Sequence, residues 1–408
     1  MKFDTIIIGG GLSGLTAGIT LAECGQKCLM VSAGQSALHF FAGSFELLGL
    51  ADNPIAAIAG LPAAHPYAKI GADNVARFAD LVKPMFADMN VHLVGDTACN
   101  HRRVTPVGLL KPAWLTLGEL ATADADGTLP WKNVTIANIK GFLDFNAGFV
   151  AANLAKQGVK ARLVEVTTPQ LAALRRNPSE MRATNIAKML EGEALAAFVA
   201  ELSKAIDGTD DAVLLPAVFG INDDEACKAL QSALNKPVKL IATLPPSVSG
   251  IRLQRAMLQR FRRLGGVVLE GDAVVKGNFE GNRLAGVFTA NHGNREFVAD
   301  NFILATGNFV THGLASTRDG VYEPALGVDI DCPADRHQWT APDIFSRQPF
   351  MSFGVATDSH LRVVKGGKTV ENLYATGNVL SGFNAVKDGC QTGVSLITGL
   401  YTAHEIIK

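Results

Sequence analysis

Residues 3–15 of the chain read FDTIIIGGGLSGL, and this stretch decides the predicted fold. A β-branched run at residues 4–8 leads directly into the spacing G-x-G-x-x-G, and an apolar helical pattern continues from there. Residues 27–32 then read as a second buried strand. Strand, glycine turn, helix and strand in this order form a βαβ unit, and its continuous apolar strands are typical of a parallel sheet covered on both faces.

The glycines of this turn have separate physical tasks. Gly9 permits the tight passage from strand to helix, Gly11 lets a pyrophosphate approach the backbone, and Gly14 lets helix and strand pack closely. Gly10 lies in the same turn, and the helix that follows offers free N–H groups and a partial positive charge to phosphate. Because the motif stands directly between a strand and a helix, it predicts a site for a phosphate-bearing cofactor at Gly9, Gly10, Gly11 and Gly14.

The end of the second strand departs from the usual dinucleotide pattern. An acidic residue about twenty positions after the glycines normally holds the adenosine ribose, and this chain has Ser32 there. Either another group holds the ribose, or the cofactor is a mononucleotide, and the sequence leaves both readings open. Ser32 and Ser36 are predicted to donate hydrogen bonds to the cofactor.

Composition excludes several classes of function. The chain has 408 residues, of which 48% are hydrophobic and 18% charged, and its formal net charge is −1. Such a balance argues against nucleic acid as a partner, and the length predicts two domains. No apolar run of about eighteen residues predicts a membrane span, and the first ten residues do not read as a signal peptide, so we expect a cytoplasmic protein. The cysteines do not cluster, so we expect no metal centre and no disulfide framework; they stand at positions 24, 28, 99, 227, 332 and 390.

Two more glycine turns follow later in the chain. ILATGN ends at residue 308, and NLYATGNVLSG spans residues 372–382 before a glycine-rich helix start at residues 389–393. The second turn resembles that of flavoproteins related to fumarate reductase and glycerol-phosphate dehydrogenases. The resemblance implies that this turn holds the ribityl chain of a flavin, and that the helix after it points its N-terminus at the pyrimidine edge of the ring. Asn378 stands where that group usually has Asp. The predicted cofactor residues here are Gly307, Gly377, Asn378, Gly389 and Thr392.

The order of the elements predicts an α/β fold with a Rossmann-type flavin-binding domain, three layers around a parallel sheet, and an inserted α/β second domain. Strand–helix–strand patterns at residues 134–166 and 212–244 predict the inserted sheet, and the first sheet resumes near residue 250. The predicted flavin-binding domain is 1–50, 250–310 and 366–408. The predicted domain for substrate or partner is 51–249 and 311–365.

A closer resemblance extends over nearly the full chain. It is carried by residues 3–15 and, in order, by GQSALHFFAGSFELLG (34–49), RVTPVGLLKPAWL (103–115), TLPPSVSGIRLQ (243–254) and GLYTAHEI (399–406). Together they resemble the B subunits of bacterial anaerobic glycerol-3-phosphate dehydrogenases.

That resemblance implies oxidation of sn-glycerol 3-phosphate to dihydroxyacetone phosphate, with electrons passed to menaquinone in anaerobic respiration. It implies a catalytic A subunit as dimer partner and an iron–sulfur C subunit that anchors both at the inner face of the cell membrane, so that membrane contact is indirect. The implied cofactor is FMN, with FAD as the alternative.

Oxidation of a phosphorylated alcohol needs a base for the hydroxyl proton and a cation for the phosphate. His39, just beyond the second strand, is the candidate base, although a packed histidine in a turn is the simpler interpretation. Arg252, at a predicted helix start, is the candidate phosphate ligand, although it can equally lie on a solvated face. The alternative function is a non-catalytic subunit that relays electrons from a partner dehydrogenase or serves only as a structural bridge.

Overall fold

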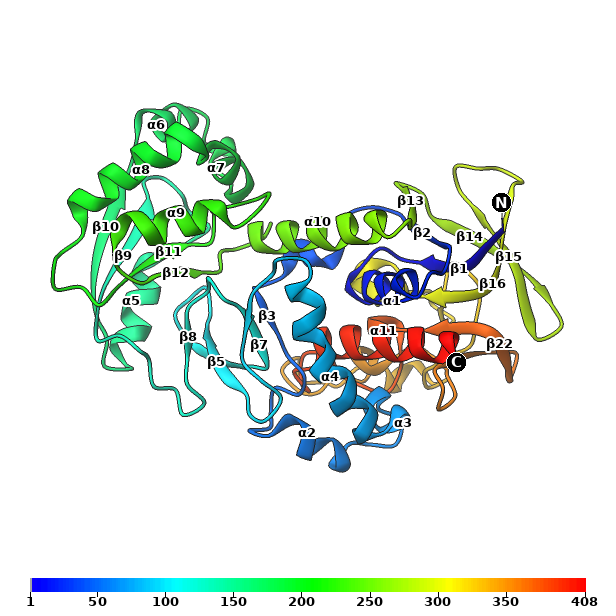
Figure 1. The fold of residues 1–408 in the computed structure, drawn as a ribbon. Coiled ribbons are helices and arrows are strands. Elements are labelled where there is room, and N and C mark those ends of the chain that lie inside the picture. The colour runs from blue at the N-terminus through cyan, green and yellow to red at the C-terminus, as the bar shows by residue number, and fades with distance from the viewer. Residues whose placement is uncertain (1) are drawn as a thin grey trace. The chain divides into compact units, whose positions relative to one another are not determined.

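A computed structural model describes residues 2–408 (Figure 1). The chain divides into two compact units. The first, which we call the glycine-turn unit, combines the chain up to Ala37 with Phe45–Asn90 and Ala256–Lys408. The second, the inserted unit, combines Leu38–Ser44 with Val91–Arg255. Among residues 2–408, no helix combines the length and the apolar character needed to cross a membrane.

The glycine-turn unit is built on a sheet whose central strands are parallel, in the order β13-β2-β1-β16. The long strand β16 pairs with β1 on one side, and on the other with the antiparallel β15 and then with the parallel β22. Ile8 is in register with Val31 and Leu304, and Leu304 with Ala375, so these strands end at one edge of the sheet. The strands are β1 (Lys2–Ile8), β2 (Cys28–Ser32), β13 (Val267–Glu270), β14 (Val274–Glu280), β15 (Arg283–Thr289), β16 (Glu296–Leu304) and β22 (Lys368–Ala375).

Two helices, α1 (Leu12–Glu23) and α11 (Gln391–Ile407), pack against each other in this unit (Figure 1). Both are buried over most of their length, which explains why their acidic and basic residues are confined to the C-terminal ends, at Glu23 in α1 and at His404 and Glu405 in α11. Small residues permit the close approach: a Cβ added to Gly399 would lie 2.8 Å from the Ser13 carbonyl oxygen. The βαβ unit predicted from residues 3–32 is therefore present, with the expected strand–helix–strand order.

The structure assigns residues 51–90 and 311–365 to the glycine-turn unit, and residues 38–44 and 250–255 to the inserted unit. The boundaries expected from sequence place each of these segments in the other domain. Long-range contacts explain the difference. Phe78 of α4 packs edge-on against Tyr401 and His404 of α11, and β21 pairs with β22. The added elements are α2 (Pro54–Ala57), α3 (Pro66–Ile70), α4 (Ala72–Ala87), β17 (Ala315–Ser316), β18 (Val321–Tyr322), β19 (Ile330–Asp331), β20 (Gly354–Val355) and β21 (Arg362–Lys365).

The inserted unit has its own parallel sheet, in the order β10-β9-β11-β12. Its buried strand β11 is fully apolar, as a central strand covered on both faces should be. Smaller antiparallel strands complete the unit, and α10 (Val248–Arg263) begins in it. The strands are β4 (Leu93–Val94), β5 (His101–Val104), β6 (Leu110–Ala113), β7 (Leu115–Leu117), β8 (Thr122–Ala123), β9 (Asn133–Ile139), β10 (Lys160–Val166), β11 (Ala212–Pro216) and β12 (Val238–Ile241), with β3 (Ser44–Phe45) at the unit boundary; the helices are α5 (Ala147–Ala155), α6 (Pro169–Leu174), α7 (Ala183–Met189), α8 (Gly192–Ala205) and α9 (Glu225–Leu234).

Candidate functional site

At Gly9 and Gly14, neighbouring backbone atoms leave the first glycine turn no room for a side chain. Gly9 has φ +121°, and a Cβ there would lie 2.3 Å from the carbonyl oxygen of Ala305. A Cβ on Gly14 would lie 2.1 Å from the carbonyl oxygen of Gly9. Both distances are far inside van der Waals contact, so only glycine lets β1, β16 and α1 meet here.

Gly11 differs, because a Cβ at this position would meet no atom within 4 Å. Gly11 caps α1 in an extended conformation, without a side-chain hydrogen bond, and the first turn of α1 carries no acidic residue. The positive end of the helix therefore faces open space. This is the donor set that suits a phosphate group.

Ser32 ends β2 beside the same turn. Its Oγ donates a hydrogen bond of 3.3 Å to the carbonyl oxygen of Gly34, and a Cβ on Gly10 would lie 2.5 Å from that Oγ. Gly10 is thus required by its contact with Ser32 and not by its backbone angles. Ser36 lies half-buried in the loop four residues further on.

The second and third glycine turns lie at the same edge of the sheet as the first. Gly377 has φ +75°, and a Cβ there would lie 2.4 Å from Ser13 Oγ at the start of α1. Gly307 has φ +83°, and a Cβ there would lie 2.1 Å from Thr311 Oγ1. The three turns predicted from sequence therefore follow the adjacent ends of β1, β16 and β22.

Two buried polar atoms at these turns have no hydrogen-bond partner among the described residues. They are Thr306 Oγ1, two residues after the end of β16, and Asn378 Oδ1, three residues after the end of β22. Buried polar groups are nearly always satisfied, so a hydroxylated or amide-bearing ligand at this edge would complete them. Asn378 was predicted here, whereas Thr306 was missed because a threonine after a strand carries no signal of its own.

The start of α11 is hydrogen-bonded to the segment that begins at Phe45. Thr392 Oγ1 accepts a hydrogen bond of 2.8 Å from the Glu46 backbone N–H and donates one of 3.3 Å to the Glu46 carboxylate. The Gly49 N–H donates to the carbonyl oxygen of Gly389 at 2.8 Å. Gly389 and Thr392, both predicted as cofactor residues, thus hold the chain in place here. The carboxylate of Glu46 at this helix N-terminus was not predicted from the sequence.

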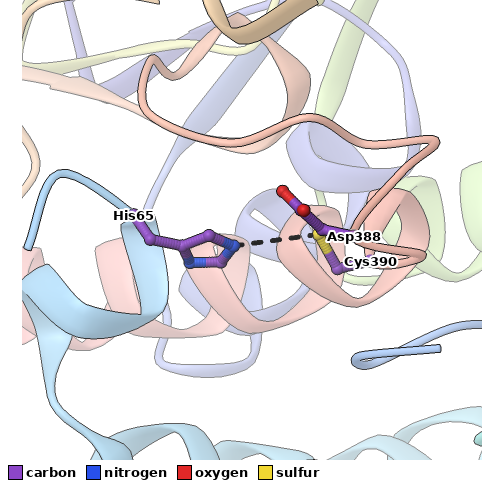
Figure 2. A group of neighbouring side chains, drawn as sticks. All are labelled: His65, Asp388 and Cys390. Carbon is purple, nitrogen blue, oxygen red and sulfur yellow. Dashed lines mark hydrogen bonds between the residues drawn. The ribbon is translucent and has the colours of Figure 1, made fainter. Parts of the chain in front are cut away.

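A buried group beneath the same helix start brings His65, Asp388 and Cys390 together (Figure 2). Their ligand atoms lie within 4.8 Å of one another, and His65 Nε2 is 3.9 Å from Cys390 Sγ. Burial lowers the pKa of His65 to about 4 and raises the pKa of the Cys390 thiol, so both are neutral near pH 7.

This group does not suit a metal ion. His65 Nδ1 accepts the Tyr67 backbone N–H at 3.1 Å, so the single proton of the neutral ring is on Nε2, which then has no lone pair for a metal. The carboxylate of Asp388 accepts two hydrogen bonds from Arg347, at 2.6 and 3.0 Å. The three side chains therefore pack and hydrogen-bond beneath α11.

The two candidate substrate residues lie in the inserted unit. Arg252 is buried; it forms an ion pair with Glu119 and donates to the carbonyl oxygens of Phe219 and Gly220 at 3.3 and 2.6 Å. Burial lowers the pKa of His39, whose ring also hydrogen-bonds to Gln254. The predicted site residues thus form two groups, with the glycine turns and their polar neighbours in one unit and His39 and Arg252 in the other.

Comparison with known proteins agrees with this architecture. A family model described as an FAD binding domain matches residues 4–394. The chain is similar to the B subunits of anaerobic glycerol-3-phosphate dehydrogenase from three bacteria: it is 42% identical to that of Yersinia enterocolitica, 43% identical to that of Yersinia pseudotuberculosis and 42% identical to that of Pectobacterium atrosepticum. Each match covers 100% of this chain and 99% of the relative. The chain therefore belongs to the family of anaerobic glycerol-3-phosphate dehydrogenase B subunits, flavoproteins with an FAD binding domain.

Proposed function

We propose that this chain is the flavin-carrying B subunit of an anaerobic glycerol-3-phosphate dehydrogenase. The complex would oxidise sn-glycerol 3-phosphate to dihydroxyacetone phosphate and pass the electrons to menaquinone. The observation that carries the proposal is the match to B subunits of such dehydrogenases over 100% of the chain, 42–43% identical. The three convergent glycine turns support it, because they provide the cofactor site that such a protein needs.

The residues at the turns fit a flavin nucleotide. In the proposed site, the first turn of α1 and the bare backbone at Gly11 bind phosphate, while Thr306 Oγ1 and Asn378 Oδ1 meet polar atoms of the cofactor. Ser32 and Ser36 stand where a second nucleotide half would lie. A bound flavin accepts a hydride or single electrons, and the task of this chain is to hold and orient it and to exclude water from its surroundings.

Between the two flavin nucleotides, we favour FAD. Its support is the FAD binding domain model that extends over residues 4–394. FMN, the cofactor implied by the closer resemblance, is supported by Ser32 at the position of the usual ribose-binding acid.

One observation favours a relay role over substrate oxidation. Arg252 forms an ion pair with Glu119, and its Nη1 donates hydrogen bonds to the carbonyl oxygens of Phe219 and Gly220. Because its partners all lie in the inserted unit, this guanidinium is already paired without a substrate phosphate. The second candidate function is therefore electron transfer, in which a partner protein oxidises the substrate and this chain passes electrons onward.

Anaerobic titration with glycerol 3-phosphate separates the two functions. Bleaching of the flavin absorbance in the isolated, flavin-loaded chain supports substrate oxidation by this chain itself. Bleaching only after the partner subunits are added supports the relay. No bleaching in either case would contradict the proposed function.

The remaining parts of the proposal concern assembly. The relatives are each one subunit of a dehydrogenase, which implies a multi-subunit complex. We propose the catalytic A subunit and the iron–sulfur C subunit as partners, with this chain in the cytoplasm, held at the inner face of the cell membrane through the C subunit.

A further inference from the structure

Large apolar side chains are exposed together on the glycine-turn unit. Their exposed fractions run from 38% at Phe350 to 83% at Phe345, and the three side chains at positions 50, 310 and 344 are each about four-fifths exposed. We call this set the Phe345 patch. Its members are Leu50, Val310, Ile344, Phe345, Phe350 and Val386.

Contacts between segments that are distant in sequence bring together the parts of the chain that carry these side chains. Lys387, next to Val386, donates from Nζ to the carbonyl oxygen of Phe345 at 2.7 Å. Arg347 forms its paired hydrogen bonds with Asp388, and the N–H of Gly49, next to Leu50, donates to the Asp388 carbonyl oxygen at 3.2 Å.

The ring of Phe350 lies 6.4 Å from that of Phe309, which precedes Val310. The segments around residues 50, 310, 345 and 386 are therefore neighbours in space, within one unit.

The patch is large for the surface of a protein that acts alone. A large apolar or aromatic side chain carries roughly 150–250 Å² of surface, so six at these exposed fractions present on the order of 800 Å². The largest apolar patch on a typical monomer is about 300–600 Å². One partner contributes about 800 Å² to a protein–protein interface of standard size. The area thus matches what a stable heterodimer needs.

We propose that the Phe345 patch is the docking surface for the A subunit of the dehydrogenase, an inference that rests on the proposed function. Permanent complexes bury more apolar interfaces than transient ones, which suits a dimer partner. The patch also adjoins the cofactor turns: Val310 follows Gly307 by three residues, and Val386 precedes Gly389 by three. A partner seated here would bring its own redox centre toward the flavin site.

The test measures the affinity of the flavin-loaded full chain for purified A subunit. In the double variant I344E/F345E, two carboxylates replace two largely exposed apolar side chains of the patch, and loss of interface anchors weakens binding roughly 30-fold or more. The matched control is Leu143→Glu, at a position 87% exposed in the inserted unit, which should bind as the wild type does. Melting temperature and flavin content show whether each variant is folded, and Phe345→Ser provides a milder change in the same direction.

Several results would overturn the inference. If I344E/F345E and Phe345→Ser bind the A subunit as tightly as the wild type does, the patch is not its docking surface. The same conclusion follows if the patch variants lose only self-association, binding to the C subunit, or flotation with vesicles of anionic phospholipid. If the wild-type chain itself does not bind the A subunit, the proposed function fails as well, so the two failures are distinguishable.

Discussion

Substitution by alanine should have different effects at two positions of the first glycine turn. It should destabilise the fold at Gly14 and weaken flavin binding at Gly11. A Cβ on Gly14 would lie 2.1 Å from the Gly9 carbonyl oxygen and 3.2 Å from Ile7 Cγ2, and the first of these contacts is with backbone that cannot rotate away. Gly14→Ala must therefore push α1 off β1. Overpacking of this kind costs about 1–3 kcal/mol, occasionally more, and we expect the upper end of that range.

Gly11→Ala should leave the protein folded, because a Cβ there meets no atom within 4 Å and the backbone angles, φ −83° and ψ −173°, suit alanine. Alanine is a poorer N-cap than glycine, so the free energy of unfolding should fall by no more than about 1 kcal/mol. In the proposed site, the methyl group enters the space reserved for phosphate, and loss of one charge-assisted hydrogen bond costs roughly 1.5–3 kcal/mol of binding, about a ten- to hundredfold loss of flavin affinity.

The assay combines denaturant unfolding of the flavin-free chain with flavin titration of the refolded chain. Gly208→Ala is the control, since a Cβ there also meets nothing within 4 Å and the residue lies in the inserted unit. The reasoning is refuted if Gly14→Ala is as stable as the wild type, or if Gly11→Ala binds flavin normally.

Three further predictions concern single side chains. Burial lowers the pKa of His65 from 6.5 to about 4 in the folded protein, so the unfolded state binds a proton first as the pH falls. The contribution of His65 to the free energy of unfolding is therefore complete above pH 6.5 and is lost toward pH 4, by at most about 1.4 kcal/mol per pH unit. His65→Asn should flatten that pH dependence in unfolding titrations. Arg252→Met removes the cation from Glu119, whose side chain is 17% exposed, and should destabilise the protein by about 1–3 kcal/mol. Adding Glu119→Leu should recover most of the loss, and an equally unstable double variant would contradict the ion-pair argument. Ser32→Glu supplies the missing ribose acid and should raise the affinity for FAD relative to FMN, with an unchanged ratio in competition titrations as the contrary result.

The parts of the structure that depend on local spacing could be predicted from the sequence. Gly9, Gly11 and Gly14 identify the βαβ unit because the turn that they build lies within six consecutive residues. Gly307 and Gly377 were found for the same reason, since each ends an apolar strand. Their convergence at one sheet edge follows from the parallel order of those strands.

Features that depend on distant partners could not be predicted in this way. Residues 311–365 contain only short strands and short 3₁₀ helices. Their membership in the glycine-turn unit rests on pairings such as β21 with β22. His65 and Cys390 are 325 residues apart, and nothing in either local sequence indicates the other.

The role of Arg252 also depends on a distant partner. An arginine at a helix start is equally consistent with binding phosphate or with an ion pair. Only the position of Glu119, 133 residues away, reveals where its charge is matched.

The central claim is that the three glycine turns hold a flavin in this chain, and one measurement tests it most directly. The purified wild-type chain is saturated with FAD and FMN together, freed of unbound nucleotide and denatured, and the released flavin is identified by mass and quantified against protein. We predict close to one flavin per chain, as FAD, with Gly11→Ala retaining far less. A wild-type chain that is folded and releases no flavin would contradict the account.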